Sequence, residues 1–505
     1  MWVAHLRSPV LHLLSKSQDS IEAAKGCQYP PADRRASFCL LRPEFFFFAF
    51  DLKLARCYYQ LLSHVRGVRD GCSPEWRAGY CTWGECSGRG RLASAGEEKT
   101  MGDFQQRGPI TTLPRLVGVD WAKRDVELGQ HANLSPAALL IPCLASEMDS
   151  PALQGMVGEI AHVHYLDTII ISLDRAGESD YQRALSYFRQ MGQRVVVMWN
   201  DSPALRALCD DVESRTVNIG QSGKGKAVWM ASGYLLGEAR VNCVALHDAD
   251  LLGYSRTLLG NLLFPIVHPG LRFSFCKAYY ARFSDRLYGR VTRLLMRPLL
   301  QALSDVVGRN LYLSYLAAFR YPLAGEMALE ADLLRWVRVP GDWGLEMGLL
   351  FEVMRHGSVR RICQVDAADQ FEHKHQDLSP DDPAAGLQRM AADIVKHLLR
   401  TLAAAGAVLP ESAFKSMRVS YQRYAEDAVA DSYAVSLFNE LLFDRHKEER
   451  AVETFGRALR EGCEQFLADP LGTPALPNWA RVESAMPNIG QRLVKAVKDL
   501  DGVLE

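Results

Sequence analysis

Hydrophobic positions in the middle of the chain form short, β-branched runs that alternate with longer segments of helical spacing. Such alternation predicts βαβ units and a parallel sheet. Three runs with few polar residues span residues 139–144, 168–174 and 194–199, as expected for strands buried on both faces. The segments between them, about 151–164 and 181–191, have helical spacing. We therefore predict an α/β fold whose strand ends gather on one edge, because the crossovers are right-handed.

The pattern changes twice and predicts three regions. Residues 1–100 mix Gly, Arg, Ser, Trp and Cys without a sustained period. We interpret them as an extension upstream of a mis-assigned start, and the alternative is a small disulfide or metal-binding module. Residues 101–384 carry the α/β pattern. Residues 385–505 are helical and show no chemical constellation, so we expect a C-terminal extension for packing or for a homodimer.

Composition narrows the class of protein. The 505 residues suffice for two or three domains, and a net charge of -1 gives no overall field for nucleic acid or an anionic membrane. No apolar run approaches the roughly 20 residues that cross a bilayer. The first residues lack the pattern of a signal peptide, so we expect a cytoplasmic protein. Of 12 cysteines, six crowd the first hundred residues without paired C-x-x-C spacing. We interpret the others as reduced, buried thiols.

Candidate chemistry begins at the fourth apolar run, residues 241–250, which ends in Asp248 and Asp250. Ligands of open α/β sheets bind at the carboxyl ends of strands. Two acids one residue apart can hold a divalent cation through hard oxygen ligands, and a cation there can neutralise a diphosphate. The alternative is that both acids only cap the next turn.

A glycine-rich turn precedes that strand. Residues 220–226 read GQSGKGK and lead into a helix, so Lys224 lies at a helix N-terminus, where an anion is favoured. The turn is not a Walker A loop, because Asn218 replaces the first glycine and Gly225 stands where Ser or Thr is needed. The strand that ends in Asp248 and Asp250 follows this helix directly, so we expect Lys224 and the acids to converge on one diphosphate. The alternative is a solvated turn with exposed lysines.

Three further features could join such a site. Residues 288–292 place Arg290 at the start of a helix, where a guanidinium and backbone N–H groups can bind phosphate or carboxylate. This turn could also be an ordinary helix entrance. Glu346 lies in the first turn of another helix, which the helix dipole favours in any case. Beside the acidic pair, His373 or His375 could complete a metal shell.

Together these motifs resemble the retaining glycosyltransferases that make glucosyl-3-phosphoglycerate, with their mannosyl relatives. The likeness runs from about residue 139 to 375 and rests on the order of the motifs more than on any one of them. The motifs are IPCL at 141–144, SGKG at 222–225, DAD at 248–250, GRVT at 289–292, GE at 325–326 and WGLEMGLL at 343–350.

The resemblance implies a GT-A fold, a Rossmann-like sheet that binds a nucleotide-sugar, followed by the helical C-terminal region. It implies a metal-dependent hexosyltransferase that moves glucose from UDP- or GDP-glucose to 3-phosphoglycerate with retention of configuration. The alternatives are a mannosyl transferase that uses GDP-mannose, a different acceptor, or a nucleotide-sugar-binding protein without catalysis.

The resemblance also implies roles for individual residues. The nucleotide-sugar would contact Pro142, Cys143, Leu144, Glu147, Ser172, Lys224, Asp248, Ala249 and Asp250. Mg²⁺ or Mn²⁺ on the diphosphate would be held by Asp248, Asp250 and either His373 or His375. The acceptor would lie against Gly289, Arg290, Val291 and Thr292. The implied catalytic residues are Asp250, Arg290 and Glu346, with Glu346 beside the acceptor hydroxyl or the sugar.

Overall fold

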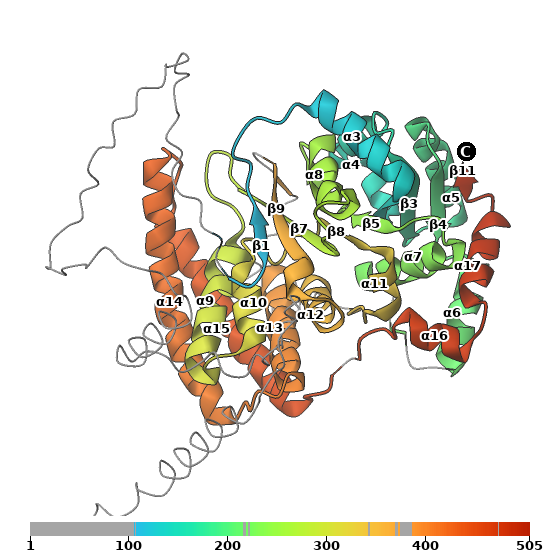
Figure 1. The fold of residues 1–505 in the computed structure, drawn as a ribbon. Helices are drawn as coiled ribbons and strands as arrows, with labels where there is room; N and C mark the ends of the chain where they lie inside the picture. The colour runs from blue at the N-terminus through green and yellow to red at the C-terminus, as the bar shows by residue number, and fades with distance from the viewer. Residues whose placement is uncertain are drawn as a thin grey trace, which may run out of the picture. The chain divides into compact units, whose positions relative to one another are not determined.

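The computed structural model describes residues 106, 108–215, 219–220, 223–341, 344–367, 386–472 and 474–504, and the backbone of residues 368, 372 and 373. The predictions for residues 1–100 and for His375 lie outside these described residues. Residues 101–505 form one compact unit (Figure 1). Among the described residues, no helix is long and apolar enough to cross a membrane.

A nine-stranded sheet runs through this unit in the order β1-β9-β7-β8-β5-β2-β3-β4-β11. A separate two-stranded sheet pairs β10 with β6. The strands of the large sheet are β1 (Thr111–Leu113), β2 (Ala137–Leu144), β3 (Leu166–Asp174), β4 (Val195–Trp199), β5 (Cys243–Leu246), β7 (Phe275–Tyr280), β8 (Met327–Glu330), β9 (Ile362–Ala368) and β11 (Val503–Leu504). Those of the small sheet are β6 (Leu251–Leu252) and β10 (Glu372–His373).

The sheet is mostly parallel, as predicted, but β8 and β11 depart from the prediction. Strand β8 runs antiparallel to both β5 and β7, and β11 runs antiparallel to β4. An antiparallel strand begins at the edge where its parallel neighbours end. The residues just before β8, Gly325 and Glu326, therefore lie at the same sheet edge as the residues just after β5.

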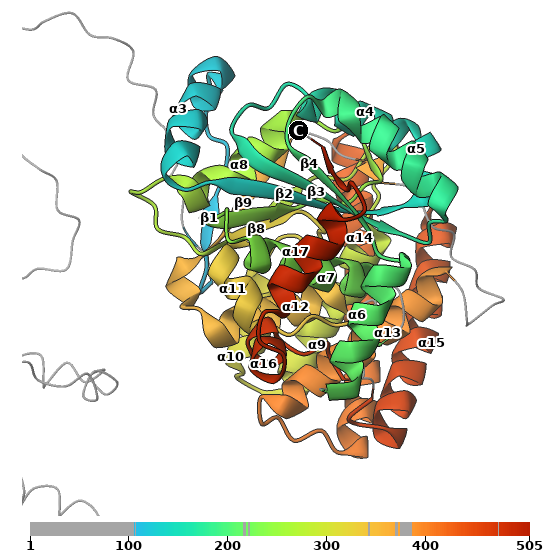
Figure 2. The same ribbon diagram turned by 90° about the vertical axis from the view of Figure 1, so that its right-hand side faces the viewer.

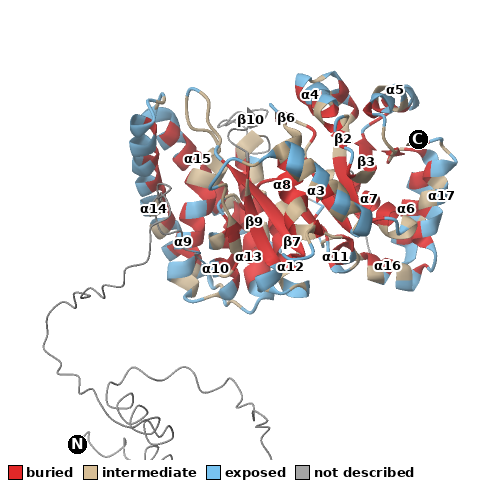
Figure 3. Ribbon diagram, turned by 45° about the horizontal axis from the view of Figure 1, so that its top comes forward, coloured by how far each residue is buried: buried red, intermediate tan, exposed pale blue. Residues whose placement is uncertain are grey.

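Side chains of the central strands alternate between two hydrophobic cores. Leu139 and Ile141 pack on one face of the sheet, whereas Ala138 and Leu140 pack on the other. Figure 3 shows the central strands as mostly buried. Because hydrophobic cores lie on both faces of the sheet, the strands appear in the sequence as continuous apolar runs. One face is covered by α3 (Trp121–Leu134), α4 (Pro151–Ile160), α5 (Glu178–Phe188) and α8 (Arg256–Val267).

The other face carries more helices, which Figure 2 shows below the sheet. They include α6 (Pro203–Arg215), α7 (Lys224–Glu238), α9 (Arg297–Val307), α10 (Leu311–Ala318), α11 (Ala331–Trp336), α12 (Leu345–His356), α13 (Gly386–Ala404), α14 (Glu411–Phe438), α15 (Arg445–Ala468), α16 (Trp479–Ala485) and α17 (Ile489–Lys498). The residues beyond 385 thus share a core with the sheet. The predicted boundary at 384/385 does not separate two compact units in the structure.

Two indoles join the C-terminal segment to α7. Trp229 and Trp479 are both buried and stack with their ring centroids 4.5 Å apart. The Trp229 Nε1–H donates to the Pro477 carbonyl (2.7 Å), and the Trp479 Nε1–H donates to the Trp229 carbonyl (2.9 Å). Both polar edges of the pair are therefore satisfied inside the core.

Candidate active site

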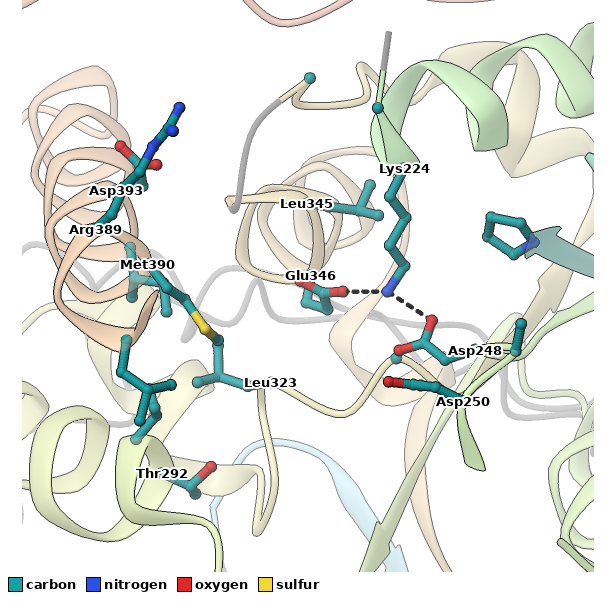
Figure 4. Close-up of a pocket in the computed structure, with 18 of the residues that line it drawn as sticks. Lys224, Asp248, Asp250, Thr292, Leu323, Leu345, Glu346, Arg389, Met390 and Asp393 are labelled. Carbon is teal, nitrogen blue, oxygen red and sulfur yellow. Dashed lines mark hydrogen bonds and ion pairs between the residues drawn. The ribbon is translucent and has the colours of Figure 1, made fainter. Parts of the chain in front are cut away.

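One cavity of about 2160 Å³ opens at the carboxyl ends of the central strands. Its two ends differ in charge. The carboxylate end is defined by Lys224, Asp248, Asp250 and Glu346, and the arginine end by Arg282, Arg286, Arg290 and Arg450. Figure 4 shows the carboxylate end with part of the opposite wall.

An ion-pair cluster organises the carboxylate end. Lys224, the first residue of α7, places its Nζ 2.6 Å from Asp248 Oδ1 and 2.8 Å from Glu346 Oε1 (Figure 4). Glu346 lies in the first turn of α12, as predicted, and Asp248 follows the end of β5. Three elements far apart in the sequence thus bring one ammonium between two carboxylates. The predicted convergence of the lysine and the acids at the sheet edge is what the structure shows.

Burial and mutual charge shift the protonation of these groups. Burial alone would lower the pKa of Lys224, but the carboxylates of Asp248 and Glu346 raise it above its usual value. Burial also raises the pKa of Asp248 to about 6, against the opposing effect of Lys224. Burial would raise the pKa of Glu346 as well, yet the Lys224 ammonium holds it below its ordinary value. Lys224 is therefore a fixed cation and Glu346 a fixed anion at neutral pH.

A second layer lies beneath this cluster. Lys277 on β7 is fully buried, and its Nζ donates to the Ala324 carbonyl; burial lowers its pKa to about 8. Glu326 is also fully buried and accepts a 2.7 Å hydrogen bond from the Tyr280 hydroxyl. Gly325 lies directly against Asp248, because a Cβ at position 325 would collide with the Asp248 carboxylate. The loop before β8 therefore sets the place of Asp248.

The donor atoms and charge of this end fit a divalent cation. Asp248 interacts electrostatically with Asp250, Glu326 and Glu346, and the two lysines Lys224 and Lys277 oppose these four carboxylates. The formal balance of four anions and two cations leaves an excess that a divalent ion with hard oxygen ligands would neutralise. The backbone of His373 in β10 pairs with Leu251, the residue after Asp250. The register thus brings His373 next to the acids, while its side chain is outside the described part of the chain.

The end of β2 and the turn after it line the cavity with four of the predicted nucleotide contacts, Pro142, Cys143, Leu144 and Glu147. The Glu147 carboxylate accepts a 2.9 Å hydrogen bond from the Leu144 backbone N–H, which holds the loop in a tight turn. Burial raises the pKa of the Cys143 thiol, so the thiol stays neutral.

Ser172 does not reach the cavity. It is fully buried, and its hydroxyl donates to the Ala227 carbonyl (2.9 Å) and accepts from Asn200 Nδ2 (2.9 Å), which ties β3 to α7. Asp174, two residues further along the strand, lines the cavity in its place. The prediction of a nucleotide contact at Ser172 is corrected accordingly: both residues point to the same face of β3, but α7 covers Ser172, whereas Asp174 stands at the end of the strand.

The arginine end starts from an unusual helix entrance. Gly289 has φ +70°, a left-handed conformation that suits glycine, and Val291–Met296 then form a π-helical turn, η4. Such turns are rare and often lie at functional sites. Gly289, Arg290, Val291 and Thr292 all line the cavity, so the structure brings the four predicted acceptor residues together.

The sequence analysis missed the helices that complete this end. Arg389, Met390 and Asp393 of α13 lie across the cavity from Lys224 (Figure 4), and Lys447 and Arg450 of α15 line its far wall. The region beyond 385 therefore forms part of the candidate site. No motif spacing in this helical region could have shown this.

Two curated relatives match most of the chain. No family model matches the chain. It is 41% identical over 399 residues to a glucosyl-3-phosphoglycerate synthase of Persephonella marina, which covers 79% of this chain and 99% of the relative. It is 36% identical over 366 residues to the synthase of that name from Methanococcoides burtonii, covering 72% and 89%.

Solved structures include that of the glucosyl-3-phosphoglycerate synthase of Mycobacterium tuberculosis in complex with Mn²⁺, UDP-glucose and phosphoglyceric acid. It is 23% identical, with a TM-score of 0.45, and covers 60% of this chain and 90% of the solved chain. The α/β fold predicted from the motifs is the fold observed here. Because the Persephonella relative is matched over almost its whole length, the chain belongs to the family of glucosyl-3-phosphoglycerate synthases.

Proposed function

We propose that the chain transfers glucose from a nucleoside diphosphate glucose, UDP- or GDP-glucose, to 3-phosphoglycerate. Family membership makes it a hexosyltransferase, as the motifs predicted. The observation that carries the proposal is the single cavity whose carboxylate end suits a metal-bound diphosphate and whose arginine end suits an anionic acceptor. The cytoplasmic location and the homodimer stay predictions from the sequence.

The carboxylate end would bind the donor. Asp248 and Asp250, with His373, would hold Mg²⁺ or Mn²⁺, the ions found with UDP in the Mycobacterium tuberculosis enzyme. When bound, the ion supplies Lewis-acid stabilisation of the charge on the leaving diphosphate. Lys224 adds a fixed cation at the same place, already oriented by Asp248 and Glu346. Pro142, Cys143, Leu144 and Glu147 would line the nucleotide.

The arginine end would hold the acceptor. Arg290 and the backbone of residues 289–292 would bind its phosphate or carboxylate, so that the hydroxyl meets the anomeric carbon, which is mainly an entropic contribution. Glu346 would position or polarise a hydroxyl, because a carboxylate held ionised by Lys224 has no proton to donate. We infer retention by attack on the face from which the diphosphate leaves, with the leaving phosphate taking the acceptor proton.

The test is a panel of donors and acceptors with the purified chain. Release of nucleoside diphosphate is followed with UDP-glucose, GDP-glucose and GDP-mannose, each with and without 3-phosphoglycerate and Mg²⁺ or Mn²⁺. We expect turnover that requires both the metal and 3-phosphoglycerate, with a glucosyl donor preferred. Preference for GDP-mannose would show that the transferred sugar is mannose instead of glucose. Donor hydrolysis that does not respond to 3-phosphoglycerate would show that 3-phosphoglycerate is not the acceptor. A folded chain that binds donors without turnover would be a binding protein.

A further inference from the structure

A buried carboxylate at the arginine end has no role in the proposed chemistry. Glu448 lies in the first turn of α15 and is 6% exposed. The helix begins at Arg445 because the Asp444 side chain caps it, accepting a 3.1 Å hydrogen bond from the Lys447 backbone N–H. This start turns Glu448 inward, while Lys447 and Arg450 on either side stay exposed and line the cavity.

Glu448 holds two arginines of the η4 turn at once. Its Oε1 accepts from Arg290 Nε (3.1 Å), and its Oε2 accepts from Arg293 Nη1 (2.8 Å). Arg293 is also fixed from other sides, by donating to Ser432 Oγ (2.6 Å) and to the Tyr288 carbonyl (2.9 Å). The bond to Arg293 thus fixes the Glu448 carboxylate in place, and the fixed carboxylate in turn orients Arg290.

Arg290, unlike Arg293, keeps part of its guanidinium available to a ligand. Within the described part of the chain, Arg290 makes its hydrogen bond through Nε, and neither Nη group has an acceptor among the described residues. Its side chain is 29% exposed, and the residue lines the cavity. A guanidinium held by Nε keeps a planar Nη pair for one oxyanion. Two arginines against one carboxylate also leave net positive charge there, so Glu448 orients Arg290 without cancelling its attraction for an anion.

We propose that Glu448 is a positioning residue for the acceptor: it fixes Arg290 so that the Nη pair is presented to the acceptor phosphate or carboxylate. This inference rests on the proposed acceptor role of Arg290. It makes the C-terminal helix α15 part of acceptor recognition, through a contact between residues 158 positions apart. A pre-oriented arginine loses less conformational entropy when the acceptor binds.

The test is Glu448→Gln, with the KM for 3-phosphoglycerate, the KM for the donor and kcat measured separately. Glutamine keeps the shape but loses the charge and offers one acceptor oxygen in place of two. We expect the acceptor KM to rise about tenfold, as for loss of a charge-assisted hydrogen bond, with donor KM and kcat nearly unchanged. Glu448→Asp, which keeps the charge, should recover part of the loss.

The matched control is Glu238→Gln. Glu238 also makes a buried ion pair, 2.6 Å from Arg194, but it does not line the cavity. We expect its acceptor KM to stay at the unmodified value. A purely structural role of Glu448 would lower thermal stability in both variants while leaving the KM ratio of acceptor to donor constant, and this would overturn the inference. A lower acceptor KM in Glu448→Gln would also overturn it, because charge alone would then dominate.

A double variant separates this inference from the proposed function. If Glu448 acts through Arg290, adding Glu448→Gln to Arg290→Ala should leave the acceptor KM where Arg290→Ala put it. A further rise in the double variant would overturn the positioning role. If Arg290→Ala alone leaves the acceptor KM unchanged, the acceptor role of Arg290 fails, and the positioning role fails with it. A high KM in Arg290→Ala beside a normal KM in Glu448→Gln would overturn the positioning role alone.

Discussion

The two ends of the cavity place charge by different means. At the carboxylate end, one lysine is clamped between Asp248 and Glu346, and the charged groups sit at strand ends and helix starts of the α/β region. At the arginine end, one carboxylate, Glu448, is shared by two arginines and comes from a helix that follows the sheet region. The first end is an anion-rich site with a fixed cation, and the second is its reverse.

With the proposed function, the difference would let one cavity accept two anionic substrates without binding either at the wrong end. The carboxylate end repels a bare phosphate and accepts a diphosphate when a divalent cation accompanies it. The arginine end attracts a phosphate or carboxylate directly. We therefore expect binding of the donor to depend on the metal ion. Binding of the acceptor should weaken as the salt concentration rises, because salt screens exposed cations.

Asp250→Ala gives the largest expected effect, because it removes a hard ligand from the carboxylate end. We expect kcat to fall by about 100-fold or more, which is the size of effect seen when one group that stabilises the transition-state charge is lost. The measurement is turnover over a range of Mn²⁺ concentrations. Asp427→Ala, on the exposed face of α14, is the control and should keep full activity. A variant at Asp250 that kept most of its activity would disprove the metal assignment.

Arg290→Ala tests the arginine end, and its effect on activity should be smaller than that of Asp250→Ala. We expect the KM for 3-phosphoglycerate to rise by about 10- to 100-fold, because a charge-assisted contact contributes about 1.5 to 3 kcal/mol. The donor KM should hardly change, since Arg290 lies away from the carboxylate end. Arg297→Ala provides the control, because Arg297 pairs with Asp431 at the surface. Equal rises in both KM values would argue against separate ends.

Gly325→Ala is the smallest change with an expected effect, since it adds one methyl group against Asp248. The displaced carboxylate should hold the metal less well, so we expect the Mn²⁺ concentration for half-maximal activity to rise and kcat to fall about tenfold. Gly129→Ala, where an added methyl meets open space, is the control. If the Mn²⁺ requirement of Gly325→Ala matched that of the control, the loop before β8 would not position Asp248.

The carboxylate end could be predicted from the sequence because its chemistry follows local rules. A strand that ends in two acids and a helix that starts with lysine must both face the edge of a parallel sheet, so Asp248 and Lys224 were expected to converge. The same rules failed at Ser172, because they do not show how far the covering helix α7 extends along β3 before the strand reaches the cavity. They also failed for β8, whose antiparallel direction depends on the return path of the chain.

The arginine end could be predicted only in part. The GRVT turn was recognisable, and its four residues line the cavity together. Its partner Glu448 was not, because a helix with charged residues on one side looks the same whether it faces solvent or a cavity. The structure begins this helix at Arg445, three residues before Glu448. Long-range packing decides such contacts.

The stacked indoles of Trp229 and Trp479 give the chain an internal optical reporter. Excited states of two rings 4.5 Å apart are shared between them, so part of the near-ultraviolet circular dichroism requires both rings in this arrangement. Trp229 lies on the helix that begins with Lys224, and Trp479 lies on the segment that follows α15. Loosening of the C-terminal segment would thus change the spectrum without any added label, and the change could be timed against the loss of turnover.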